Sequence, residues 1–193
     1  MRALTIRQPY AWAIIHGGKN VENRTRNIVG DFKGLVAIHA AQKPTEICEL
    51  PDRDHPLWPP LVSAHKAYPE NREIDFERFA YGAVIGVAEI VGSHMTGDTL
   101  VCRRTQGRAM FGKLYTEAPS KIRLVERDVG PCSPWADMTP GMWHIELANP
   151  IALPEPVPCR GRLGLWTLPE HVAARVTDQL KPLKENHGTL NPT

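Results

Sequence analysis

The segment LTIRQPYAWAIIHGGKNVENRTRN, residues 4–27, decides how the N-terminal part of this chain folds. Residues 3–7 alternate like a strand, and PYAWAIIH, residues 9–16, has the apolar spacing of a short helix. The Gly pair that follows can end this helix in a left-handed conformation. Residues 19–25 are typical of an extended segment. The pattern therefore predicts a strand, a helix and a returning segment that carries Lys, Glu and Arg side chains.

The start of this helix is predicted to attract anions. Pro9 suits the first helical position, because its missing N–H would find no helical partner there. Gln8, which precedes it, is a weak N-cap, so the sequence itself does not cap the first N–H groups. Unsatisfied N–H groups beside Arg7 form a natural anion site.

The charged residues after the Gly pair can reach the same place. In a regular strand Lys19 and Glu22 would point to opposite faces, so they share a cleft only if a turn or bulge follows the glycines. With Arg24 they would then face the helix start. The residues expected to line this cleft are Arg7, Gln8, Pro9, Tyr10, Lys19, Glu22 and Arg24.

A solvated edge is the alternative interpretation. Glu22 would then pair with Arg24 or Arg26, and spacing alone favours a surface position for Lys19. Trp12 is expected in the core. Tyr10 suits the core and stacking on a ligand equally well.

Apolar runs predict the rest of a mainly β chain. We expect strands at residues 34–41, 82–92 and 141–153, a turn at Asn149-Pro150, a short strand near Trp166 and a helix over residues 169–180. His39, in the first of these strands, is expected to be a satisfied core histidine. Several strands with few helices predict an α+β fold: a curled, mixed sheet or small barrel with short helices packed at its ends.

Two irregular insertions are expected in this domain. Residues 42–80 contain six prolines, which break long elements, and residues 93–130 are basic and less regular. The domain would span residues 1–168 and be followed, over residues 169–193, by the helix and a frayed tail.

The charge is unevenly distributed, although the net charge is only +2. Residues 1–34 contain six Lys or Arg and two Asp or Glu, and residues 101–128 contain seven and three. The second basic segment interleaves Phe111 with cationic residues, which suits a contact with nucleic acid and equally a solvated loop. Its candidate nucleic-acid contacts are Arg103, Arg104, Arg108 and Lys113.

The four cysteines, Cys48, Cys102, Cys132 and Cys159, include no C-x-x-C pair. The spacing therefore favours neither a disulfide framework nor a metal site, and no cofactor is expected. No run of about 18 apolar residues predicts a membrane span. A cytoplasmic protein without a membrane partner is the expectation.

The segment at residues 4–25 resembles the N-terminal signature of the ASCH domain family, in particular members that begin with R-Q-P-[YW]-A. The segments GLVAIHAA, GAVIGVAEIVG and SPWADMTPGMWHIELANPIALPEPVPCRGRLGLWTLP fit the same family in order, so that the resemblance covers about residues 3–168. It implies a PUA-like barrel. PUA-like domains commonly bind RNA, so the expected partner is RNA or a modified nucleoside or nucleotide.

The resemblance also implies an alternative activity. One ASCH member is an amidohydrolase that acts on N4-acetylcytidine, and others are ribonucleases. The amidohydrolase uses a Lys after a Gly, a Thr three residues later and a distant Glu. Gly18-Lys19 matches the first pair, and Glu22 stands where that enzyme has Thr. If this chain is a hydrolase, Lys19 and Glu22 are its candidate catalytic residues.

Overall fold

A computed structural model describes residues 1–44, 79–97, 108–110, 113–116, 123–125 and 131–187. Its largest element is a six-stranded sheet in the order β2-β8-β4-β3-β1-β9. These strands are β1 (Arg2–Ile6), β2 (Val21–Arg24), β3 (Gly34–Ala40), β4 (Ala83–Met95), β8 (Trp143–Pro158) and β9 (Leu165–Thr167). β1 and β3 are parallel and the other neighbours are antiparallel. The sheet is therefore mixed, as predicted.

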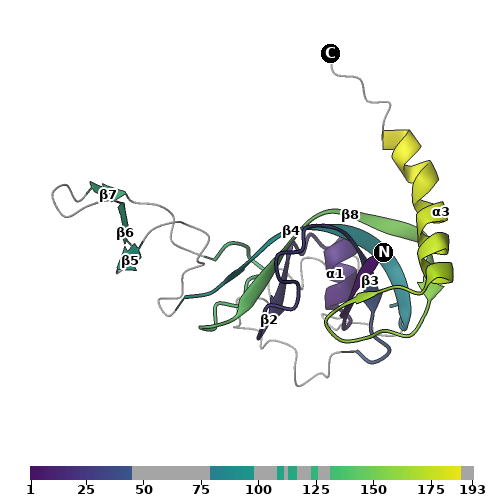
Figure 1. The fold of residues 1–193 in the computed structure, drawn as a ribbon, viewed down its shortest axis with the longest axis horizontal. Helices are drawn as coiled ribbons and strands as arrows, with labels where there is room; N and C mark the ends of the chain where they lie inside the picture. Colours follow the sequence, from purple (N-terminus) through teal and green to yellow (C-terminus); the bar gives the residue numbers. More distant parts are fainter. Residues whose placement is uncertain (45–78, 98–107, 111–112, 117–122, 126–130, 188–193) are drawn as a thin grey trace, which may run out of the picture.

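The sheet curls into a half-barrel (Figure 1), which confirms the predicted curled, mainly β fold. The longest strands, β4 and β8, follow the curl, and their pairing contains three register shifts. One shift lies at Asn149 and Pro150, where Asn149 has a φ of 50°. The predicted turn there is wrong: because β8 pairs with β4 on both sides, the two residues form a bulge inside one strand.

Helix α1 (Tyr10–His16) lies under the arch of β4 and β8 (Figure 1). It buries Ala11, Ile14 and Ile15 in a core with residues of β1, β3, β4 and β8. Trp12 was expected in this core, but it is only half-buried and its ring lies beside those of His16 and Phe79. The short apolar stripe of α1 is therefore made by aliphatic side chains.

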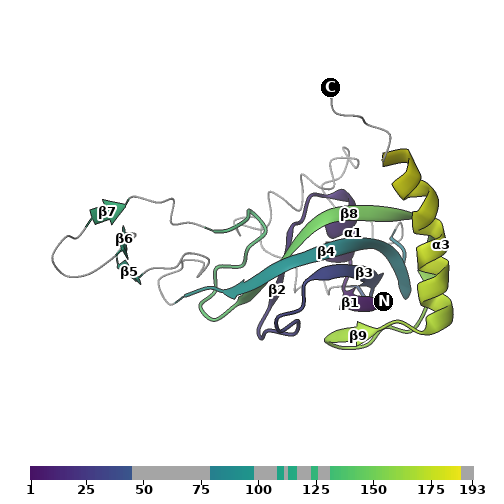
Figure 2. The same cartoon turned by 45° about the horizontal axis from the view of Figure 1, so that its top comes forward.

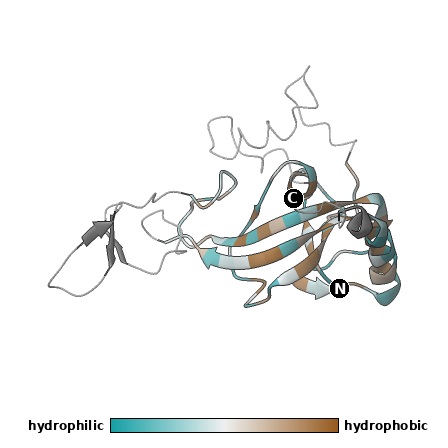
Figure 3. Ribbon diagram, turned by 90° about the horizontal axis from the view of Figure 1, so that it is seen from above, coloured by the Kyte–Doolittle hydropathy of each residue, from teal (hydrophilic) through white to brown (hydrophobic). Residues whose placement is uncertain are grey.

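Helix α3 (Glu170–His187) covers the other face of the sheet, across the ends of β8 and β4 (Figure 2). Val172, Val176 and Leu180 recur at helical spacing and pack on a second apolar cluster that includes Val84 and Trp166. The helix is longer than predicted and takes in the first residues of the expected tail. The sheet thus contributes to two apolar clusters, one with α1 and one with α3. Figure 3 shows the hydrophobic residues along its strands.

A separate antiparallel sheet consists of β5 (Arg108–Met110), β6 (Lys113–Thr116) and β7 (Arg123–Val125). Residues 93–130 were predicted to be less regular than the rest of the domain; these three short strands lie among them, and β4 itself continues to Met95. Among the described helices, none has the length and apolar content needed to span a membrane.

Candidate functional site

The turn after α1 directs Lys19 into the protein. Gly18 has a φ of 71°, which a glycine adopts without strain, and the N–H groups of Gly17 and Lys19 both donate to the carbonyl of Ala13. β2 begins only at Val21, so Lys19 lies before the strand. The side chains of Lys19 and Glu22 can therefore meet despite their spacing. Lys19 is 3% exposed, so the surface position favoured by spacing is wrong.

The ammonium of Lys19 is enclosed by two aromatic rings and two oxygen groups. Its Nζ lies 5.6 Å from the ring centre of Tyr10 and 5.7 Å from that of Trp135. It donates to the carbonyl oxygen of Val21 and lies 3.5 Å from Oε2 of Glu22. Burial lowers the pKa of Lys19, and the Glu22 carboxylate only partly opposes this effect.

Glu22 lies between two cations. Its other oxygen, Oε1, is 3.1 Å from Nη2 of Arg24, and Glu22 is 7% exposed. The same Nη2 donates to the carbonyl of Thr5 at 3.0 Å, which ties the return segment to β1. Nε of Arg24 is buried and has no hydrogen-bond partner among the described residues, while about a third of the side chain is exposed. The predicted solvated Glu22–Arg24 edge is therefore wrong, although the pair itself exists.

The expectation that the first N–H groups of the helix lack partners is also wrong. Gln8 is 1% exposed, and its Oε1 accepts a hydrogen bond of 2.9 Å from the backbone N–H of Trp12. Its Nε2 donates to the carbonyl of Ala80. The N–H of Ala11 donates to the carbonyl of Arg7. The N–H groups of Ala11 and Trp12 in the first turn thus already have partners within the protein.

The structure brings together four of the seven residues predicted for the cleft: Tyr10, Lys19, Glu22 and Arg24. The other three are placed differently. Gln8 serves the helix start, Pro9 is buried as its N-cap after a cis peptide bond, and Arg7 is exposed.

The predicted nucleic-acid contacts lie in the second basic segment. Arg103 and Arg104 are outside the described residues. Arg108 and Lys113 are the first residues of β5 and β6, and only their backbone is described.

Trp135 completes the group around Lys19, and sequence reasoning missed it. The side chain of Asn23 donates to the carbonyl of Trp135 at 2.9 Å and accepts from the N–H of Asp137 at 3.1 Å. Ser133 donates to the side chain of Asn20. Segment 132–138 is thereby held against β2 and the residues before it. Its only signal in the sequence is a Trp in a polar stretch, which does not identify what the ring covers. We refer to Tyr10, Lys19, Glu22, Arg24 and Trp135 as the lysine cluster.

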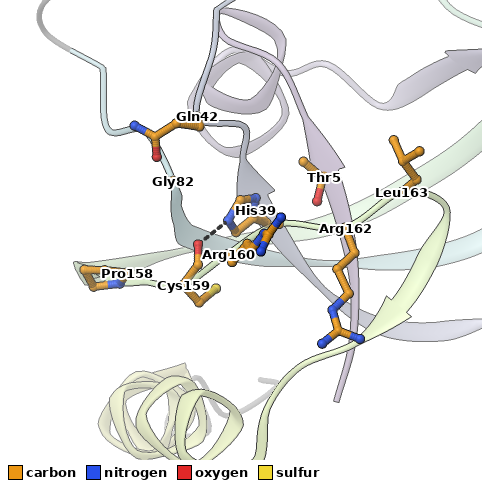
Figure 4. A pocket seen from close by; sticks show the side chains of 10 residues that line it. Thr5, His39, Gln42, Gly82, Pro158, Cys159, Arg160, Arg162 and Leu163 are labelled. Atoms are coloured by element: carbon orange, nitrogen blue, oxygen red, sulfur yellow. Dashed lines mark hydrogen bonds between the residues drawn. The ribbon is translucent and has the colours of Figure 1, made fainter.

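A cavity of about 730 Å³ has a lining that includes none of the lysine-cluster residues, and Figure 4 shows its side chains. It is lined by Thr5, His39, Gln42, Gly82 and residues 158–163, which include Arg160 and Arg162. His39 is fully buried, which confirms its predicted core position, but within the described part of the chain it is hydrogen-bonded on one side only: its Nε2 lies 2.9 Å from the carbonyl oxygen of Cys159. A carbonyl only accepts, so Nε2 carries the proton, and Nδ1 has no hydrogen-bond partner among the described residues. Burial lowers the pKa of His39, which keeps the ring neutral.

No protein-family model matches this sequence. The lysine cluster and the cavity must therefore be interpreted from their own chemistry. The lysine cluster combines cations, aromatic rings and a carboxylate. The cavity combines two arginines with a histidine acceptor.

Proposed function

We propose that the chain is an ASCH-type, PUA-like cytoplasmic protein that binds RNA or a nucleotide at the lysine cluster. One observation carries the proposal. Two cationic side chains, two aromatic rings and one carboxylate converge where the helix start meets the return segment. Nucleic-acid sites combine cations for phosphate with aromatic faces for bases.

The exposed parts of the cluster suit such a ligand. Arg24 is about a third exposed, and its guanidinium is held in place by Glu22 and the Thr5 carbonyl, so that its remaining N–H groups can donate to a phosphate. Tyr10 is half-buried, and stacking of a base on its ring is the second contact we propose. Lys19 is enclosed, so its contribution is positive potential beneath the ligand.

Fluorescence anisotropy with a labelled short single-stranded RNA tests this proposal. Arg24→Gln should weaken binding about tenfold, the effect of losing one charge-assisted phosphate contact. Arg2→Gln is the matched control, because Arg2 is an exposed arginine on β1 whose side chain donates to Thr167 outside the cluster. Equal affinities of the parent and Arg24→Gln, or no binding at low salt, would contradict the proposal. Thermal melts of both variants separate lost binding from lost folding.

Salt dependence tests the second basic segment. For single strands, the logarithm of the affinity falls with the logarithm of the salt concentration, with a slope of about −0.7 per neutralised phosphate. If the segment extends the surface, replacing Arg103, Arg104 and Arg108 together with Ala should flatten this slope. An unchanged slope would confine the contact to the lysine cluster.

A hydrolase is the second candidate, and the burial of Lys19 favours it. A lysine with a lowered pKa can act as a general base or can stabilise developing negative charge. Glu22, 3.5 Å from Nζ, would orient a water molecule for attack on an amide or phosphodiester bond. This chemistry fits the amidohydrolase and ribonuclease activities that the family resemblance implies.

Mass spectrometry of products separates the two candidates. The parent protein is incubated with N4-acetylcytidine, other modified nucleosides and short RNAs. Lys19→Met keeps most of the length of the side chain and removes the amine, so any turnover should be lost while the fold remains. Binding of RNA or a nucleoside without detectable products supports a function in binding alone. Products that persist in Lys19→Met would exclude Lys19 as the catalytic base.

A further inference from the structure

Two buried histidines face each other at the far end of the main sheet. His94 on β4 is the direct cross-strand partner of His144 on β8, and the rings meet edge to face with centroids 5.1 Å apart. Nε2 of His94 lies 3.3 Å from Nδ1 of His144, and Sγ of Cys132 lies 3.3 Å from the same Nδ1. The three atoms all lie within 4.8 Å of one another. Two nitrogens and one sulfur therefore converge on a single point.

The other ring nitrogens fix where the protons are. Nδ1 of His94 lies 2.7 Å from Oε1 of Glu146, and Nε2 of His144 lies 2.8 Å from the carbonyl oxygen of Asp137. A carboxylate and a carbonyl accept hydrogen bonds, so each of these nitrogens carries a proton. In neutral rings the nitrogens that face each other then both present lone pairs. A metal ion between them, bound also by the sulfur of Cys132, would use both lone pairs.

The distances agree with a metal ion. Zn²⁺ binds histidine nitrogen at about 2.0–2.1 Å, so two nitrogens in a tetrahedral site are separated by about 3.3–3.4 Å. The histidine nitrogens of this cluster are 3.3 Å apart. Histidines that bind metals usually donate their second N–H to a carboxylate or a backbone carbonyl, which are the partners that Glu146 and Asp137 supply.

We propose that His94, Cys132 and His144 bind a zinc ion. The spacing of cysteines along the sequence predicts no metal site, because this donor set is assembled by strand pairing and not by a local motif. The exposed fractions are 8% for His94 and 0% for His144, and Cys132 is partly exposed at the start of segment 132–138. Three protein ligands leave a fourth position for water or another donor. The ion would fasten this segment to β4 and β8.

Metal titration of the full chain tests the proposal. The protein is purified under reducing conditions, treated with a chelator and titrated with Zn²⁺ by calorimetry, and with Co²⁺ by absorption spectroscopy. We expect one high-affinity ion per chain and a cobalt–thiolate charge-transfer band. Cys132→Ser should abolish the band. Cys159→Ser is the matched control, because Cys159 is a partly exposed cysteine outside the cluster, and it should leave the band unchanged.

A milder variant guards against misfolding. Glu146→Gln keeps all three metal ligands and weakens only the support of His94, so zinc affinity should fall about 10–100-fold. Circular dichroism checks the fold of each variant. The proposal is overturned if the folded parent binds no zinc at one equivalent per chain, or if the cobalt–thiolate band persists in Cys132→Ser. A proton shared by the two histidines would then account for their approach.

Discussion

Replacement of Lys19 by alanine tests whether this lysine is part of the core. The ammonium of Lys19 lies near the rings of Tyr10 and Trp135, and only 3% of the residue is exposed, so its aliphatic stem is buried as well. Removing a buried chain of this length leaves a cavity that typically costs 2–5 kcal/mol. Glu22 is not left unpaired, because Arg24 remains 3.1 Å away. We therefore expect Lys19→Ala to lower the free energy of unfolding by about 2–4 kcal/mol and the Tm by roughly 5–15 °C.

Lys19→Met separates the stem from the charge. Methionine fills much of the same space and avoids placing an ammonium in a desolvated site, so its stability should be within about 1 kcal/mol of the parent at neutral pH. The pKa of folded Lys19 lies below the ordinary 10.5, so between the two values the unfolded chain binds more protons. Stability of the parent should therefore rise with pH through this window. Lys19→Met should lack that rise, so any stability advantage of this variant over the parent should become smaller as the pH approaches 10.5.

Urea denaturation followed by circular dichroism, at several pH values between neutral and about 10.5, measures both effects. The fitted slope must be the same for all three proteins, because a change in slope would report a change in the unfolded state. Destabilisation of Lys19→Met by as much as Lys19→Ala would show that the charge, not the stem, is required. A loss below about 0.5 kcal/mol in Lys19→Ala would refute the core position of this side chain.

Three further changes test other parts of the structure. Burial raises the pKa of Tyr10 from 10.0 to about 12, and nearby carboxylates add to this effect. The stability of the parent should therefore fall as the pH rises above 10. Alkaline melts of Tyr10→Phe should lack this fall in stability. Gly86→Ala would place a Cβ 2.5 Å from Ile15 and should cost about 1–3 kcal/mol in urea denaturation, whereas Gly92→Ala meets only ordinary contacts at 3.7 Å and should be nearly neutral. Gln8→Ala leaves two backbone groups without their partner and should lower stability by about 1–3 kcal/mol in the same assay.

The sheet could be predicted because its signal is local. Strands β3 and β4 have long apolar runs, which are typical of buried strands. Pro9 and Gly17 mark the start and the end of helix α1 in the sequence. Asn149 and Pro150 show where local signals mislead. The pair favours a turn in isolation, but the hydrogen bonds of β8 with β4 on both sides keep it within one strand.

The environment of the candidate site could not be predicted, because its partners are distant in the sequence. Nothing within the return segment indicates that Trp135 covers Lys19, so a surface lysine was the reasonable expectation. Gln8 is a weak N-cap by residue type, yet burial against the Ala80 carbonyl holds its amide where it caps the helix. In both cases tertiary contacts override a preference that is correct for an isolated segment.

Segment 132–138 connects the lysine cluster with the proposed zinc site. Its Trp135 ring lies over the Lys19 ammonium, and the carbonyl of Asp137, two residues later, accepts a hydrogen bond from Nε2 of His144. Asn23 on β2 bonds to the backbone of both Trp135 and Asp137, so the segment cannot shift at one end without loosening the other. A metal ion held by Cys132 at the start of this segment would therefore also help to keep the tryptophan over the lysine. On this basis the zinc ion would support the lysine cluster structurally, and its removal would weaken the position of Trp135 over Lys19.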